Sequence, residues 1–183
     1  MNHVIRKVFF DFEKEEKFIN EMSANGLALK QYSFGKYVFE DAPKGEYIYR
    51  LELLEHPANH EDSQDYIQYM EEMGAELVTS YFRWAYFRKK AVDGEFTIYS
   101  DNDSKIRHYK RIMSLFIIVA GLNFIIGLFN VFNGSLMAAK GYPPVNTYLA
   151  IVSFSIVALF VPFLILPLRK NINNLEKEKG IRE

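Results

Sequence analysis

Residues 112–132 read IMSLFIIVAGLNFIIGLFNVF, and residues 145–168 read VNTYLAIVSFSIVALFVPFLILPL. Neither stretch contains a charged residue, and each has about the twenty apolar residues that a helix needs to cross a bilayer. The pair predicts a transmembrane hairpin with a first helix over 112–132, an external loop over 133–144 and a second helix over 145–168. We expect this hairpin to organise the rest of the chain.

The part of the chain before the hairpin has the composition of a soluble domain. Residues 1–111 hold 16 Lys and Arg against 20 Asp and Glu, whereas residues 112–168 contain one charged side chain, Lys140. About a hundred residues are enough to bury a core. The sequence therefore predicts a domain over 1–100 and a helical linker over 101–111. Because the chain has no cysteine, it can have no disulfide, thiolate nucleophile or cysteine metal site.

Basic residues near the two apolar stretches predict the orientation of the hairpin. Basic residues lie just outside both stretches, whereas the loop between them offers only Lys140. Those before the first stretch are Lys105, Arg107, Lys110 and Arg111, and those after the second include Arg169, Lys170, Lys177 and Lys179. Basic residues near membrane helices remain on the cytoplasmic side. The N-terminus lacks the pattern of a secretory signal. We therefore expect a two-pass protein of the cell membrane, with both termini cytoplasmic and residues 169–183 forming a cytoplasmic tail.

Apolar periodicity predicts six elements in the soluble part. They alternate as strand, helix, two strands, helix and strand, at 4–12, 13–25, 27–40, 47–54, 62–73 and 77–90. Asn25-Gly26 and Gly74 are typical helix ends. Gly35 indicates a bulge or a tight bend in the second strand. Residues 95–99 could add a short strand, and Asp101 or Asp103 could cap a helix that continues unbroken into the first span.

A repeat with an offset of 48 residues relates the two halves of this domain. It aligns Phe18 with Tyr66, Gly26 with Gly74 and Phe34 with Phe82. A duplicated strand–helix–strand unit is typical of a ferredoxin-like βαββαβ fold, in which two helices cover one face of a four-stranded antiparallel sheet. The predicted fold class is therefore α+β, with a ferredoxin-like cytoplasmic domain followed by the two-helix hairpin. An irregular α+β domain is the alternative.

Two clusters of acidic or histidine residues have some features of metal sites. His56 and His60 lie near Glu61 and Asp62, but Pro57 interrupts the helix that would align the histidines, so a surface loop is the preferred interpretation. Residues 101–104 begin like a calcium loop but lack its glycine and final glutamate. With no phosphate-binding loop or nucleophile motif either, the sequence predicts no metal, cofactor or catalytic residue.

The segment 83–90, RWAYFRKK, combines aromatic and basic side chains as single-strand nucleic-acid platforms do. The domain is nevertheless net acidic and lacks the glycine-containing consensus of such platforms. Core packing or contact with anionic headgroups is therefore favoured, and direct nucleic-acid binding is not expected.

One face of the first apolar stretch carries Asn123, Gly127 and Asn130. Small residues allow close helix contact in lipid, and amides there seek partners. Packing of the hairpin is the preferred interpretation, and a polar path for a solute, which would require oligomers, is the alternative. Pro162 and Pro167 are expected to bend the end of the second helix.

Four segments of the chain carry a family resemblance: 10–15 (FDFEKE), 45–50 (GEYIYR), 83–89 (RWAYFRK) and 100–105 (SDNDSK). Through them, residues 1–112 resemble a family of small membrane proteins of Gram-positive bacteria, domain of unknown function 2812. The resemblance implies a cytoplasmic domain followed by membrane helices, often encoded beside a PadR-like transcription regulator. It implies no activity and no catalytic residue. The positions of interest for partner binding are Tyr47, Tyr49, Arg50, Arg83, Trp84 and Arg88, which join aromatic stacking to charged hydrogen bonding.

Two functions follow as hypotheses. In the first, the protein is a non-enzymatic, membrane-anchored regulatory or sensory module whose sheet face or edge binds a cytosolic protein such as a transcription regulator. In the second, the spans oligomerise through the stripe of Asn123, Gly127 and Asn130, and the protein is a ligand-binding or transport-associated subunit. An enzyme is a third and weaker alternative, because fold alone decides no activity.

Overall fold

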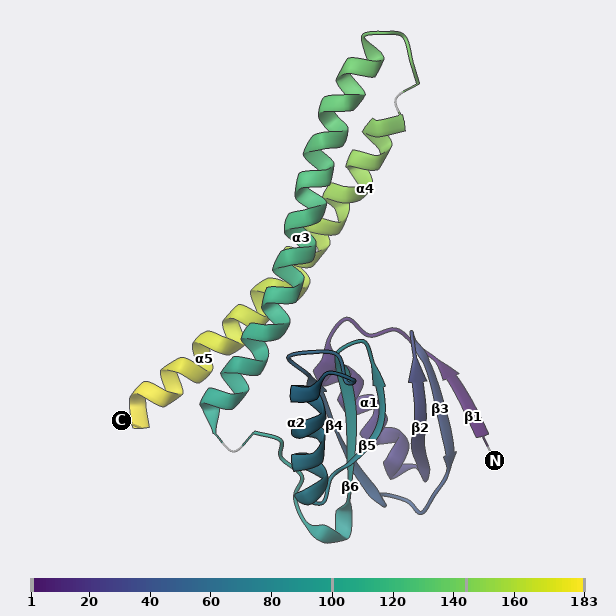
Figure 1. The fold of residues 1–183 in the computed structure, drawn as a ribbon, viewed down its shortest axis with the longest axis vertical. Coiled ribbons are helices and arrows are strands. Elements are labelled where there is room, and N and C mark those ends of the chain that lie inside the picture. Colours follow the sequence, from purple (N-terminus) through teal and green to yellow (C-terminus); the bar gives the residue numbers. More distant parts are fainter. Residues whose placement is uncertain (1, 100, 144, 183) are drawn as a thin grey trace. The chain divides into compact units, whose positions relative to one another are not determined.

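The structure is a computed structural model that describes residues 2–99, 101–143 and 145–182 (Figure 1). The chain divides into two compact units, residues 1–100 and 101–183. The first unit is a mixed α+β fold, and the second consists of helices. Each unit is described by itself.

The first unit contains six strands in two antiparallel sheets. The first sheet has the order β1-β3-β2 and the second has the order β4-β6-β5. Each sheet therefore comes from a strand–helix–hairpin segment with the same order, so the repeat in the sequence is a repeat in the structure. The elements are β1 (Asn2–Arg6), α1 (Phe12–Ala24), β2 (Leu27–Ser33), β3 (Lys36–Asp41), β4 (Tyr47–Leu53), α2 (Glu61–Glu72), β5 (Glu76–Tyr81), β6 (Trp84–Lys90) and the short 3-10 turn η1 (Ala91–Asp93).

Two of the predicted strands fold as hairpins instead. Residues 27–40 turn at Phe34-Gly35, and residues 77–90 turn at Phe82-Arg83. Gly35 has a φ of 69° and Phe82 has a φ of 54°, so each hairpin reverses through a residue in the left-handed region. The four-stranded ferredoxin-like sheet is therefore not confirmed. Residues 95–99 form no strand, and the first strand ends at Arg6 rather than residue 12.

The side chains of β6 pack alternately into two different cores. Tyr86 joins the core under α1, which includes Phe18, Ile19, Tyr37 and residues of both sheets. Ala85 and Phe87 point the other way, into a core with Ile67 and Met70 of α2. The two helices thus lie on opposite faces of this strand, and the prediction that both cover one face is wrong.

The ends of the helices follow the sequence signals. Asp11 caps α1 by accepting the Glu13 N–H at 3.0 Å. The chain leaves α1 through Gly26, whose φ of 89° only glycine adopts easily, and it leaves α2 through Gly74, with a φ of 84°. The predicted helix ends at Gly26 and Gly74 are confirmed to within two residues.

The second unit is a long helical hairpin. It consists of α3 (Asn102–Ala138), α4 (Val145–Phe160), the π-helical turn η2 (Val161–Ile165) and α5 (Leu166–Arg182). Asp101 caps α3 by accepting the Ser104 N–H at 2.6 Å, and the helix continues unbroken into the apolar stretch, as predicted. Residues 102–138 and 145–179 are long and apolar enough to cross a bilayer, which is compatible with a membrane protein.

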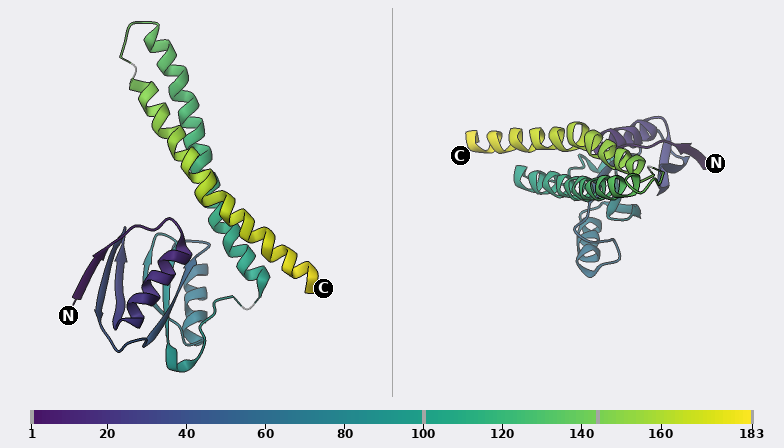
Figure 2. Two further views of the ribbon diagram at one scale, coloured as in Figure 1. Left: turned by 180° about the vertical axis from the view of Figure 1, so that it is seen from behind. Right: turned by 90° about the horizontal axis from the view of Figure 1, so that it is seen from above.

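The chain changes direction between α4 and α5, where η2 contains Pro162 (Figure 2). A proline inside a helix removes a hydrogen bond and displaces the preceding turn. Beyond this point α5 is held to the start of α3 by two ion pairs. Lys179 Nζ lies 2.9 Å from Asp103 Oδ2, and Lys110 Nζ lies 2.8 Å from Glu176 Oε1.

A seam of small residues at seven-residue intervals joins α3 to α4. Ala120, Gly127 and Gly134 are buried, and a Cβ added to Gly127 would lie 2.9 Å from the Phe154 ring. Asn123 and Asn130 are part of the predicted stripe, but each amide donates to the carbonyl four residues earlier in its own helix. Gly127 therefore lies in the contact between α3 and α4, while the two amides are satisfied within α3.

We predict that Gly127→Leu loosens this hairpin, because the new side chain displaces the Phe154 ring. The expected loss in the free energy of unfolding is about 1–3 kcal/mol. Gly121→Leu is the matched control, since nothing lies within 4 Å of a Cβ at Gly121. Thermal unfolding of both variants in detergent micelles, followed by circular dichroism, measures the difference. Equal melting temperatures of the two variants would contradict the assignment of Gly127 to the contact between α3 and α4.

Candidate functional site

Helix α1 covers the outer edge of β4 with polar side chains. Ser23 Oγ donates to the Tyr47 carbonyl at 2.6 Å, and Glu16 Oε2 accepts the Leu51 N–H at 3.0 Å. Between them Asn20 donates to the Tyr49 carbonyl and accepts the Tyr49 N–H. These three side chains are spaced by four and three residues and so share one helical face. The helix thus satisfies the groups that a neighbouring strand would otherwise pair.

The outer edge of β1 lacks such a cover. Lys7 donates its N–H to the Gly35 carbonyl, so His3 and Ile5 face β3 with their backbone groups. By the alternation of antiparallel pairing, the N–H and C=O groups of Asn2, Val4 and Arg6 face outward. Within the described ranges no hydrogen bond reaches these groups, and the Val4 side chain is 55% exposed. The β1 edge, meaning the outward backbone groups of Asn2, Val4 and Arg6, can therefore accept another strand.

The six residues predicted to bind a partner do not form one surface. Tyr49 is completely buried, and its hydroxyl accepts the Leu29 N–H at 2.9 Å. Burial raises the pKa of this hydroxyl. Because Tyr49 holds the core together, its assignment to a contact surface is wrong.

Tyr47 and Arg88 form a local stack beside it. The Arg88 guanidinium lies 4.3 Å from the centre of the Tyr47 ring and makes two hydrogen bonds of 2.8 Å to Glu76. Such a bidentate pair fixes the side chain in one orientation. The stack ties β4, β5 and β6 together.

The other three predicted residues are also engaged within the fold. Arg50 Nη1 lies 3.2 Å from Glu16 Oε1, and Arg83 Nε donates to the Leu54 carbonyl at 2.8 Å. Trp84 packs on Phe12 with a ring distance of 5.7 Å. In the described contacts these three residues pair with other parts of the fold, and their role in partner binding stays a prediction.

A buried carboxylate, that of Glu15, connects the two sheets. Glu15 Oε1 accepts hydrogen bonds of 2.7 Å from Tyr37 of β3 and from Tyr86 of β6. Burial raises the pKa of Glu15, and the two hydroxyl donors partly oppose this rise. The apolar neighbours Phe18 and Ile19 were the only signal in the sequence that this part of the helix faces inward.

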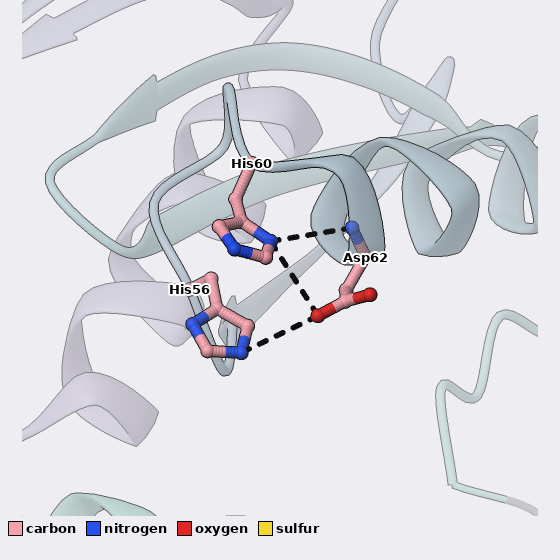
Figure 3. A group of neighbouring side chains, drawn as sticks. All are labelled: His56, His60 and Asp62. Atoms are coloured by element: carbon pink, nitrogen blue, oxygen red, sulfur yellow. Dashed lines mark hydrogen bonds and ion pairs between the residues drawn. The ribbon is translucent and has the colours of Figure 1, made fainter.

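A cluster of His56, His60 and Asp62 lies where β4 leads into α2 (Figure 3). The two imidazole rings stack with centroids 4.1 Å apart, and His56 Nε2 and His60 Nδ1 each lie 3.5 Å from Asp62 Oδ2. His60 also caps α2, because its Nδ1 accepts the Asp62 N–H. The turn in which the His60 N–H bonds to the Pro57 carbonyl brings the rings together, so Pro57 assembles the cluster rather than separating it.

Among the residues that the structure describes, these three side chains form a group that could hold a divalent metal. Each histidine nitrogen lies 3.5 Å from Asp62 Oδ2. This is the distance between two ligand atoms of a tetrahedral site whose metal–ligand bonds are about 2.1 Å long. The imidazoles are about half exposed, at 46% and 47%, and the Nδ1 lone pair of His60 is already used by the helix cap. The geometry therefore favours a capped turn over a closed metal site.

Comparison with known protein families shows which family the chain is similar to. A family model described as "Protein of unknown function (DUF2812)" matches residues 11–120, which extend from the cap of α1 into the apolar part of α3. No curated protein and no solved structure matches the chain.

We predict that Glu15→Ala destabilises the α+β unit by about 3–5 kcal/mol, because it leaves two buried tyrosine hydroxyls without an acceptor. Glu15→Gln keeps an acceptor oxygen and removes the buried charge. Since burial raises the pKa of Glu15 above its ordinary 4.5, the folded state holds its proton more tightly than the unfolded state. The wild type should therefore lose stability as the pH rises from 4.5 through the raised pKa, and Glu15→Gln should lack this loss.

Denaturant unfolding of the full chain in detergent, followed by Trp84 fluorescence over a pH series, measures both effects. Lys17→Ala, an exposed change on the same helix, is the control. If Glu15→Gln were as unstable as Glu15→Ala at every pH, the two tyrosine bonds would not be the role of this carboxyl.

We predict that His60→Ala costs about 1 kcal/mol of stability through loss of the α2 cap. The loss should be the same in the presence of Zn²⁺ and in the presence of a chelator, because the cap needs no ion. His60→Asn, which can still cap, should recover most of it. A melting temperature that Zn²⁺ raises in the wild type but not in His60→Ala would instead identify a metal site.

Proposed function

Because the chain belongs to the DUF2812 family of proteins of unknown function, whose matched region joins the α+β unit to the first apolar helix, we propose a function that uses both parts. The protein is a non-enzymatic, membrane-anchored regulatory protein. Its α+β unit binds a cytosolic protein, and helices α3 to α5 form a two-pass anchor with both termini in the cytoplasm.

The observation that carries this proposal is the β1 edge. An extended segment of another protein can add to such an edge through backbone hydrogen bonds, with side chains giving specificity. β1 has five residues, a usual length for a strand, and Val4 offers an apolar contact beside the outward backbone groups. The equivalent edge of β4 is occupied by α1, which leaves β1 for the partner.

The second unit supports the regulatory part of the proposal. Its two long helices carry basic residues at the ends that we place in the cytoplasm, among them Lys110 and Lys179. A binding unit fixed to a membrane keeps its partner there, so the amount of partner in the cytosol depends on occupancy of the β1 edge. A transcription regulator is the partner class that the family resemblance implies.

The transport-associated alternative has less support. It needs Gly127 and its stripe to face another chain, whereas Gly127 lies against Phe154 of the same hairpin. An enzyme also has less support, because Glu15 braces two sheets and His60 caps a helix. The contacts of Glu15 and His60 therefore give each residue a structural role, and neither contact requires a catalytic role.

We predict that a photo-cross-linking amino acid at Asn2 captures one discrete protein in cells, and that Val4→Pro lowers this adduct about tenfold. Proline removes the outward N–H of Val4, which β3 does not use, so the β1–β3 pairing remains. The tenfold decrease corresponds to the loss of one backbone hydrogen bond together with the steric crowding that the proline ring adds at the edge. Mass spectrometry of the adduct identifies the partner.

Val4→Thr is the matched control, since it keeps both the N–H and a β-branched side chain. It should cross-link like the wild type. A cross-linker at Lys44, in the turn before β4, gives the background level. An adduct at Asn2 no stronger than at Lys44, or one that Val4→Pro leaves unchanged, would reject the β1 edge as the binding site.

A further inference from the structure

Four connections of the α+β unit lie at one end of its sheets: β1–α1, β2–β3, β4–α2 and β5–β6. β1 and β2 both pair antiparallel with β3, so they run in the same direction, and the β1–α1 connection lies beside the β2–β3 turn. In the second sheet β4 and β5 likewise both pair antiparallel with β6, so the β4–α2 connection lies beside the β5–β6 turn. Tyr32 is the last residue but one of β2, and Tyr81 is the last residue of β5. Their rings are 5.5 Å apart, so both hairpin turns lie at the same end (Figure 1). We call this end, with residues 6–10, 33–36 and 82, the loop end.

The loop end exposes large aromatic side chains. Phe10 is 68% exposed, Phe34 is 79% exposed and Phe82 is 78% exposed. Val8, also exposed, lies beside the Phe34-Gly35 turn, because a Cβ on Gly35 would be 2.9 Å from its Cγ2. A cluster of exposed apolar groups at one place marks an interaction site more than scattered ones do. One such ring, Phe34 or Phe82, stands at the equivalent turn of each repeat.

Phe82 adopts a backbone conformation that is unfavourable for its side chain. Its φ of 54° lies in the left-handed region, where glycine or asparagine is usual. The ring contacts Tyr81 but stays largely in solvent, so burial within the unit does not offset the strain. Residues held this way occur at functional sites. The position thus maintains an exposed ring where stability alone favours a different residue.

A basic groove of about 550 Å³ opens beside these rings. It is lined by Arg6, Lys7, Lys36, Val8, Ser33, Phe34 and Gly35. No carboxylate lines it in the described part of the chain, and the ion pairs given for that part do not include its three basic side chains. The nearby Asp11 is used as the cap of α1 and pairs with Lys14 at 3.6 Å. The Lys7 ammonium also lies over two rings of the fold, 4.8 Å from the centres of Phe9 and Phe18. The groove therefore has three basic residues next to exposed apolar groups.

We propose that the loop end binds the surface of an anionic bilayer, with a lipid phosphate in the basic groove and the rings of Phe34 and Phe82 among the headgroups and upper acyl chains. Cations beside aromatic side chains are the combination that this interface selects, because the phosphates are anionic and the layer beneath them is apolar. A soluble anion would need the cations but not the exposed rings.

The second unit makes this ligand available to the loop end. Two helices of the same chain are apolar and long enough to cross a bilayer, so a lipid surface is present at high effective concentration. Weak contacts are enough under these conditions. Arg6 belongs both to the loop end and to the β1 edge of the proposed protein partner. The bilayer contact is therefore tested at Lys7, Lys36, Phe34 and Phe82 and the partner contact at Val4, so the two remain distinguishable.

The test uses the full chain in lipid nanodiscs, with an environment-sensitive fluorophore on Ser33→Cys. Because the chain has no cysteine, the label has a single site. In discs with about a third anionic phosphatidylglycerol we expect a blue-shifted emission that added salt reverses. In neutral phosphatidylcholine discs the emission should resemble that in water. A label on Lys44→Cys, in the β3–β4 turn at the other end of β3, is the control and should stay solvent-like in both.

Two sets of variants separate the parts of the site. Lys7→Gln and Lys36→Gln should each weaken the shift about fivefold, and Phe34→Ser with Phe82→Asn should abolish it, the asparagine being compatible with the positive φ. Solvent-like emission at position 33 in anionic discs at low salt would overturn the proposal. A shift produced by inorganic phosphate in neutral discs would also overturn it, in favour of a soluble anion.

Discussion

The hydrogen bonds between one face of α1 and the edge of β4 determine how the α+β unit is built. A strand at the edge of a sheet has to pair its outward groups with something, and here Glu16, Asn20 and Ser23 supply the partners. The adjacent position Glu15 turns into the core and binds tyrosines from both sheets. The helix therefore fixes both the distance between the sheets and the edge that remains open.

The duplication explains why only one edge is covered. The positions in α2 that correspond to Glu16, Asn20 and Ser23 are Gln64, Gln68 and Glu71, and they do not reach β1. Gln64 donates to the Ala58 carbonyl and Gln68 to Glu72, both close to their own helix. Two copies of one strand–helix–hairpin segment have thus diverged, so that the first helix closes the second sheet while the first sheet stays open at β1. This asymmetry is the structural basis of the proposed partner binding.

Much of this arrangement could be predicted from the sequence, and the failures have local causes. The two apolar stretches predicted the division into two units. The 48-residue offset predicted the repeat, and Gly26 and Gly74 predicted the helix ends. The hairpins were missed because Phe82-Arg83 contains no glycine and the Phe34-Gly35 turn resembles a bulge. The sequence indicated His56, His60 and Asp62 as a candidate cluster, but the expectation that Pro57 keeps the rings apart considered only a helix, whereas a turn through Pro57 brings them together. The burial of Tyr49 depends on contacts with α1 that no local pattern records.

Hydrogen exchange of the full chain in detergent tests the central claim most directly. The amides of Tyr49 and Leu51 are bonded only by side chains of α1, so their protection reports whether the helix covers β4. We predict that both are protected like core amides, that Asn20→Ala removes the protection at Tyr49, and that the outward amide of Val4 exchanges rapidly. Rapid exchange at Tyr49 in the wild type, or equal protection at Val4, would contradict the account of one closed and one open edge.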